Sequence, residues 1–147
     1  MKKIRKIAVE QNFAAISVGK LNELNEYELQ LGPDVKIPGK VFCSTALGTT
    51  GSEFSFQSFA PGTETGFLHS HKRHEELYFF LSGKGEFQVA GTVFPVVSLA
   101  GKRSVRNNGT TPLLMLCIQY CSNTFSQEDA TDGIILKEPV KWKVSPK

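Results

Sequence analysis

The most informative stretch of the sequence is residues 61–85, which read PGTETGFLHSHKRHEELYFFLSGKG. It contains all three histidines of the chain, His69, His71 and His74, and two glutamates follow directly. On a β-strand, His69 and His71 project from the same face, because side chains alternate along a strand. Two imidazoles and one carboxylate on one face can hold a catalytic Fe(II), and these ligands also suit Zn, Ni or Mn. The stretch therefore indicates a site for a divalent transition metal.

The spacing within this stretch resembles the first motif of the cupin family. In that motif a glycine precedes His-x-His by five residues, a glutamate follows three or four residues later, and six more residues lead to a second glycine. Gly62, His69, His71, Glu76 and Gly83 match this order with one additional residue before His69, and one more residue in a loop costs little. The resemblance implies His69, His71 and Glu76 as metal ligands. The spacing to Gly83 selects Glu76, the second of the two glutamates.

The second cupin motif, which usually contributes one more histidine, is matched less well. The nearest stretch is residues 100–109, AGKRSVRNNG, and it contains no histidine. Alignment on Gly101 puts Ser104 in the place of the fourth ligand, whereas alignment on the Asn-x-Gly turn puts Arg103 there, which we favour. A serine leaves room for water or substrate on a metal, whereas a guanidinium cannot ligate a cation and repels it. The usual fourth ligand is absent in either alignment, and the segment between the two motifs is short for the family.

Four residues are candidates for a substrate pocket. Tyr78 and Phe80 share the strand parity of Glu76, so we expect both to face inward beside it, mainly as core side chains. Arg103 and Ser104 are the other two candidates. An arginine that points into the interior favours an anionic ligand such as a carboxylate.

The composition fits one all-β domain. The chain has 147 residues, of which 40% are hydrophobic, and its 13 glycines suit many turns. The cupin resemblance, which covers about residues 41–121, implies a double-stranded β-helix, or jelly-roll barrel. We therefore expect an N-terminal arm over 1–40, a barrel over 41–125 and a C-terminal tail over 126–147 that packs on the barrel through apolar residues such as Ile134 and Trp142.

Alternating and apolar runs predict the strands of this barrel. One is expected around Phe54 and Phe56, one at His69–His71 and one, the longest, at 113–120. Residues 77–81 and 86–89 flank a glycine-rich turn as the two strands of a hairpin do, and a strand at 92–97 follows. In the arm, Leu21, Leu24 and Tyr27 fit a helical stripe, but Tyr27, Leu29 and Leu31 alternate with polar residues and favour a strand.

Charge and hydropathy exclude several classes of partner. The net charge is only +3, and the one basic cluster at the N-terminus lacks interleaved aromatic residues, so nucleic acid is not indicated. No stretch has the length of a signal peptide core or of a membrane span. Three cysteines, an odd number, favour thiols in a reducing compartment, and we expect a cytoplasmic protein. Because cupins often pair through their sheets and the arm offers a strand, we also expect a homodimer.

Two functions fit these observations. The first is a metal-dependent enzyme, an oxygenase or an isomerase as the resemblance implies, that acts on a small molecule at the open positions of the metal. The second is a barrel that binds a sugar or an organic acid without turnover, with the metal structural, weakly held or absent. The open coordination positions favour the first function, whereas the missing histidine favours the second, because three ligands hold a metal less tightly than four. We prefer a metal-binding cupin of unassigned activity.

Overall fold

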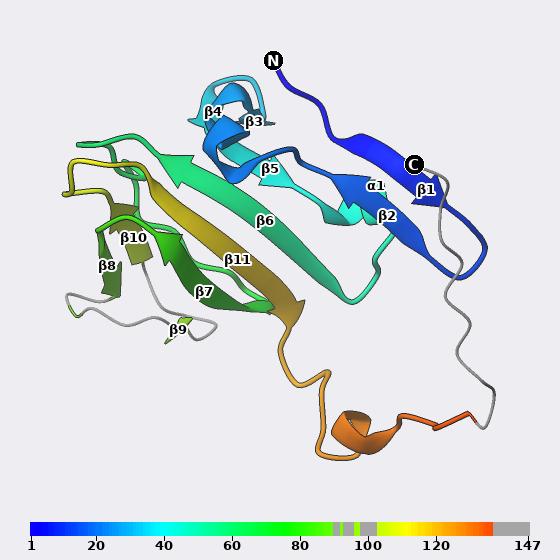
Figure 1. Ribbon diagram of the computed structural model, residues 1–147. Coiled ribbons are helices and arrows are strands. Elements are labelled where there is room, and N and C mark those ends of the chain that lie inside the picture. Colours follow the sequence, from blue (N-terminus) through cyan, green and yellow to red (C-terminus); the bar gives the residue numbers. More distant parts are fainter. Residues whose placement is uncertain (90–91, 93–95, 98–102, 137–147) are drawn as a thin grey trace.

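The computed structural model describes residues 1–89, 92, 96–97 and 103–136 (Figure 1). These residues form mainly β-strands, which confirms the all-β class. The strands are β1 (Arg5–Val9), β2 (Ala14–Ser17), β3 (Glu28–Leu31), β4 (Val35–Pro38), β5 (Lys40–Phe42), β6 (Ser52–Phe59), β7 (His74–Ser82), β8 (Glu86–Val89), β9 (Val96–Val97), β10 (Arg103–Arg106) and β11 (Leu113–Cys121). The short helices are η1 (Leu21–Glu26), α1 (Ser44–Leu47) and η2 (Asp129–Thr131).

Two antiparallel sheets enclose the main core. The larger sheet has the strand order β5-β6-β11-β7-β9, and β8 pairs with β10 in a separate two-stranded sheet. Figure 1 shows β6, β11 and β7 as the long strands of the larger sheet. The core joins both sheets, because it contains side chains from β6, β7, β8, β10 and β11: Phe59, Tyr78, Phe87, Val105, Leu113, Met115 and Cys117. Inward residues alternate with outward ones along β6 and β11, as the pleat of a half-buried strand requires.

The hairpin expected from residues 77–81 and 86–89 is wrong. The strand β7 pairs with β11 and β9, whereas β8 pairs with β10. The turn between β7 and β8 contains Gly83, whose φ is 87° and whose added Cβ would lie 2.4 Å from the Pro112 carbonyl oxygen. Only glycine fits this close approach in that conformation. The turn therefore leads the chain from one sheet into the other.

The N-terminal arm packs on the outer face of the larger sheet of its own chain. Leu24 of η1 and Tyr27 form a second core with Val41, and Phe56 and Leu114 pack against it. The helical stripe and the strand considered for this region are both present, since η1 ends at Glu26 and β3 starts at Glu28. The arm is therefore part of the fold, and its β3–β4 hairpin lies next to β5.

The tail differs from the expected packing. The chain leaves β11 and runs away from the sheets (Figure 1). Phe125, Ile134, Ile135 and Leu136 are all at least 70% exposed, so these apolar side chains do not cover the barrel. Residues 137–147, which include Trp142, lie outside the described residues, as do residues 93–95 of the strand expected at 92–97.

Within the described ranges, no helix has both the length and the apolar character that a transmembrane segment needs.

Candidate metal and ligand site

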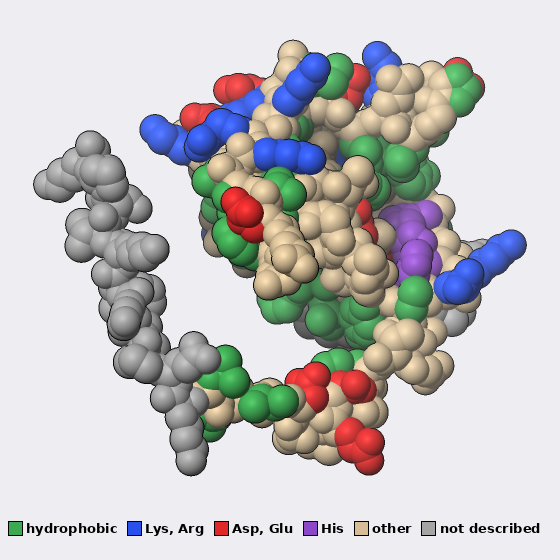
Figure 2. Space-filling model, turned by 90° about the vertical axis from the view of Figure 1, so that its right-hand side faces the viewer, with side chains coloured by type: hydrophobic (Ala, Val, Ile, Leu, Met, Phe, Trp, Pro, Cys, Tyr) green, Lys and Arg blue, Asp and Glu red, His purple; other side chains and the backbone are tan. Residues whose placement is uncertain are grey.

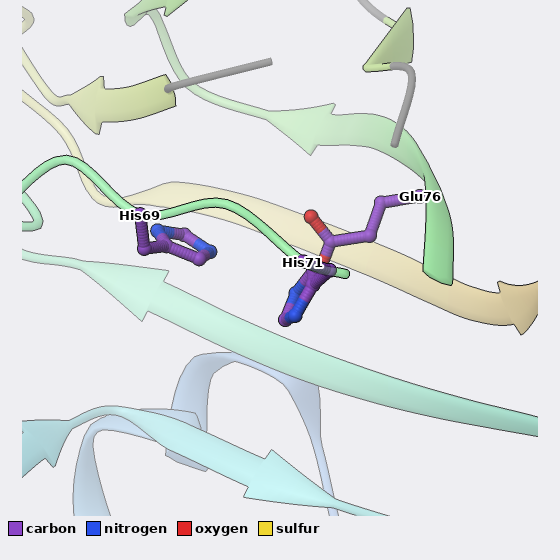
Figure 3. Close-up of side chains that lie close together, drawn as sticks. All are labelled: His69, His71 and Glu76. Carbon is purple, nitrogen blue, oxygen red and sulfur yellow. The ribbon is translucent and has the colours of Figure 1, made fainter. Parts of the chain in front are cut away.

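His69, His71 and Glu76 lie together (Figure 3). The two histidines come from the loop between β6 and β7, and Glu76 comes from β7 itself. One potential ligand atom from each residue lies within 4.8 Å of the other two, and His71 Nε2 is 3.0 Å from Glu76 Oε1. The strand expected at His69–His71 is instead a loop that makes one antiparallel bridge, between His69 and Arg103. Two backbone hydrogen bonds, of 3.4 and 3.3 Å, hold His69 at this bridge.

The imidazole of His69 has an unmet hydrogen-bonding capacity. Its Nδ1 is buried and has no hydrogen-bond partner among the described residues. Burial, together with the charge of Arg103, lowers the pKa of His69 to about 4. The ring is therefore neutral near physiological pH, which is the form that ligates a metal. A buried nitrogen without a partner is unfavourable, so His69 Nδ1 is able to bind a group from outside the described residues.

Glu76 is at the centre of a buried hydrogen-bond network. Its side chain is 2% exposed, and its Oε2 accepts hydrogen bonds from Tyr78 Oη at 2.5 Å and from the Arg103 guanidinium. Its Oε1 accepts a hydrogen bond from Gln119 Nε2 at 2.6 Å. Burial alone raises the pKa of Glu76, but the Tyr78 hydrogen bond and the Arg103 charge outweigh it and bring the pKa to about 2. Glu76 is therefore a carboxylate with a fixed orientation.

Arg103 lies beside Glu76 in this buried network. It is 1% exposed, and its Nε also donates a hydrogen bond to Tyr78 Oη at 3.1 Å. Ser104 has the opposite parity on β10, so it does not reach Glu76 in the same way. Of the two alternatives from the sequence, the Arg103 side chain is thus the one in contact with the candidate ligand.

A cavity of about 280 Å³ adjoins these residues. Its lining includes His69, His71, Tyr78, Arg103 and Ser104. Figure 2 shows the histidine side chains as a patch that is visible on one face of the molecule, so the site is reachable from solvent.

Two other residues considered from the sequence, Phe80 and His74, are not part of the His69-His71-Glu76 group. Phe80 has the strand parity of Tyr78, but it is 41% exposed and is not among the residues that line the cavity. Its ring centroid is 6.3 Å from that of Phe87. A register shift between Leu114 and Met115 of β11 falls opposite this end of β7. His74 begins β7, and its ring centroid is 5.6 Å from that of His71.

Sequence reasoning missed two polar residues of the interior. Gln119 has the same parity on β11 as the buried Met115 and Cys117, and this parity was available from the alternation of the strand. Lys40 lines the cavity from β5. It immediately follows a Pro-Gly break, and nothing local in the sequence indicates that its ammonium points inward.

The donor set fits a divalent transition metal. Two imidazoles and a carboxylate suit Zn, Fe, Ni or Mn, and Gln119 and Tyr78 orient the carboxylate as outer partners of metal ligands do. Arg103 opposes the metal, because its positive charge already pairs with Glu76. The residues can therefore hold a metal with three protein ligands, in competition with a guanidinium.

No protein-family model matches the chain, and no curated protein matches it. Solved structures do. A cupin protein from Bacteroides fragilis is 28% identical, with a TM-score of 0.61 over 75% of this chain and 96% of that chain. A protein from Thermus thermophilus is 16% identical, with a TM-score of 0.52 over 71% of this chain and 96% of that one, and it supports the fold alone. With the two-sheet architecture and the His-His-Glu group, the match to the Bacteroides fragilis cupin protein shows that the chain belongs to the cupin superfamily and has its double-stranded β-helix fold.

Proposed function

We propose that this chain is a metal-binding cupin that takes a small molecule into its barrel, with a divalent transition metal bound by His69, His71 and Glu76. The observation that supports it most is the buried Nδ1 of His69, which has no hydrogen-bond partner in the described part of the chain and lies beside a second imidazole and a carboxylate. A structural histidine in a core normally has a hydrogen-bond partner. A ligand from outside the chain removes this deficit.

Each side chain has a distinct part in this proposal. His69 and His71 offer nitrogen ligands, and Glu76 offers an oxygen that Gln119 and Tyr78 orient. When bound, such a metal supplies Lewis acidity or, in the case of iron, redox chemistry toward a small molecule. Arg103 and Tyr78 donate hydrogen bonds to Glu76 Oε2, whereas His71 Nε2 lies 3.0 Å from Oε1, so Oε1 is the carboxylate oxygen on the side of the imidazoles. If the protein turns that molecule over, the reaction that we propose is that of an oxygenase or an isomerase.

A barrel that binds its ligand without a metal is the second candidate. The Arg103–Glu76 ion pair favours it, because the guanidinium neutralises the buried carboxylate as a cation would. The ligand would then be a sugar or an organic acid.

Metal content distinguishes the two candidates. The tag-free protein, reconstituted in turn with Fe(II), Zn, Ni and Mn, is analysed by mass spectrometry beside His69→Ala, Glu76→Ala and the control His74→Ala. About one metal per chain in the wild type and in His74→Ala, lost in the other two variants, supports the metal-binding function. No metal with any of the four ions rejects it and leaves the metal-free barrel.

A homodimer is a further part of the proposal. Support comes from the family habit and from the arm, which already lies on the outer face of a sheet and offers β-strands near the surface.

A further inference from the structure

Lys40 faces the interior of the barrel. In the antiparallel register of β5 and β6, Lys40 pairs with Gln57 and Phe42 pairs with Ser55, and both partners are buried on the inner face. Val41 lies between them and has the opposite parity, and it packs outward in the second core under the arm. The alternation of the strand therefore sends the side chains of Lys40 and Phe42 into the cavity, which both residues line.

The backbone before Lys40 leaves little freedom for this placement to change. Gly39 has a φ of 72°, donates a hydrogen bond to the Tyr27 carbonyl at 2.8 Å and accepts one from the Ser58 amide at 2.9 Å. A Cβ on Gly39 would lie 2.3 Å from the Ser58 carbonyl oxygen. The start of β5 is thus held against β6, and Lys40 with it.

The ammonium of Lys40 has no anionic partner within the described part of the chain. Its Nζ lies over the ring of Phe42, 5.4 Å from the centroid, and no salt bridge forms with it there. The exposed Lys36 and Arg106, in contrast, pair with Glu28 and Glu86. Burial lowers the pKa of Lys40, which shows that the charged form pays a desolvation penalty in this position.

The charges of the described residues around the cavity do not balance. Lys40 and Arg103 line the cavity, and Glu76 forms its ion pair with Arg103, whereas Glu76 and Glu53 act on Lys40 without a salt bridge. Among the described lining residues, one positive charge has no salt-bridge partner even before any charge on a histidine is counted. A metal at the His-His-Glu group would increase this excess. A partly buried charge without a partner is unfavourable, and an anion that enters the cavity would complete the pair.

The walls of the cavity are largely apolar. Besides the polar groups already named, they contain side chains from the larger sheet, from the loop between β6 and β7 and from the β3–β4 hairpin: Leu29, Ile37, Phe42, Phe59, Phe67 and Met115. The volume of about 280 Å³ lies at the lower end of ligand pockets, so the fitting molecule is small. Apolar walls and a single excess charge match a monocarboxylate with a carbon frame better than they match a phosphate, whose charge is nearer to two and whose surface is wholly polar.

We propose that the cavity binds a small organic acid, whose carboxylate pairs with the ammonium of Lys40 and whose carbon frame lies against Phe42, Phe59 and Met115. This inference rests on the proposed small-molecule function of the barrel and names its ligand class. It does not require that the metal be present. A neutral sugar, the other ligand class that the fold suggests, offers no anion to Lys40.

The test compares acids with their uncharged amides. Binding of butyrate, benzoate, butyramide, benzamide and inorganic phosphate to the full chain at neutral pH is followed by amide chemical shifts in NMR, with and without EDTA. At least one of the two acids binds, and its amide binds at least about tenfold more weakly, because a charge-assisted hydrogen bond is lost. Phosphate binds more weakly than that acid.

Variants of Lys40 assign the preference to this residue. Lys40→Met reduces the affinity for the acid by at least about tenfold and removes the preference over the amide, whereas Lys40→Arg keeps most of the preference. The matched control is Lys36→Met, which removes an exposed lysine of the neighbouring strand β4 and leaves acid binding unchanged. Lys40→Met also folds at least as stably as the wild type in urea, because it removes a partly buried charge and keeps the apolar stem.

Four results overturn the inference: no binding of either acid, equal binding of acid and amide, tighter binding of phosphate, or unchanged acid binding in Lys40→Met. Metal content, measured on the same samples, is expected to be the same in Lys40→Met and the wild type. A protein that binds acids through Lys40 but takes up no metal contradicts the metal-binding function and leaves this inference intact. A protein that holds its metal but does not prefer acids contradicts this inference alone.

Discussion

The substitution Arg103→Met tests the buried ion pair at the site. Arg103 and Glu76 are 1% and 2% exposed, and the guanidinium donates hydrogen bonds to both the Glu76 carboxylate and the Tyr78 hydroxyl. Methionine matches much of the length of the arginine stem but removes the charge. Glu76 then remains as a buried carboxylate without its cation, and loss of one partner of a buried pair destabilises a protein by about 3–5 kcal/mol.

The assay is urea unfolding at neutral pH in the presence of EDTA. The matched control is Arg106→Met, on the same strand, because Arg106 pairs with Glu86 at the surface. This exposed pair is expected to contribute no more than about 1 kcal/mol. The double variant Arg103→Met/Glu76→Met is expected to be more stable than Arg103→Met, because no unpaired charge is left in the interior.

Zinc connects this measurement to the proposed metal site. In Arg103→Met a metal no longer competes with a guanidinium for Glu76, so added Zn(II) is expected to stabilise the variant more than it stabilises the wild type. A destabilisation by Arg103→Met of less than about 1 kcal/mol, in the range of an exposed pair, would refute the reasoning about Glu76. Equal stabilisation of both proteins by Zn(II) would refute the competition.

Three further predictions follow from other parts of the fold. Gly39→Ala is expected to destabilise the protein by more than Gly32→Ala. Gly32 has nearly the same φ, 71°, but an added Cβ there would have nothing within 4 Å. Equal losses of unfolding free energy in the two variants would contradict a clash with Ser58. Acid binding is expected to weaken as the pH rises through the lowered pKa of Lys40, because the ammonium, which faces Cys117, Glu76, Arg103 and Glu53, loses its charge; a titration by NMR that shows the same pH step in Lys40→Met would show that another group causes it. Light scattering of the full chain is expected to yield twice the chain mass of 16.2 kDa, and a monomer mass would reject the homodimer.

The sequence predicts the ligand group because that group is local. His69, His71 and Glu76 lie within eight consecutive positions, so a short motif contains all three, and the structure places their ligand atoms within 4.8 Å of one another. The wrong hairpin has the opposite cause. The strand β7 follows the pattern of a hairpin partner for β8, but it pairs with β11, whose residues lie more distant in the chain, and this pairing depends on how the two sheets pack.

Lys40 and Gln119 were not predicted because their places in the site depend on how their strands pair with other strands. Lys40 faces inward only because β5 pairs in register with β6, and Gln119 reaches Glu76 only because β11 lies beside β7. The choice between Arg103 and Ser104 likewise depended on the register of β10, where Arg103 shares the inward parity of Val105. Residues that act through a contact across strands have no spacing signature in a single sequence.

Anomalous diffraction from crystals of the Zn(II)-treated protein, with data collected on both sides of the zinc absorption edge, tests the metal site most directly. The proposed site predicts one strong anomalous peak at about 2.0–2.2 Å from a nitrogen of His69, a nitrogen of His71 and an oxygen of Glu76. A zinc peak at a different place in the protein would contradict the proposed site. The absence of a peak at this group, with the Arg103–Glu76 ion pair intact, would also contradict it.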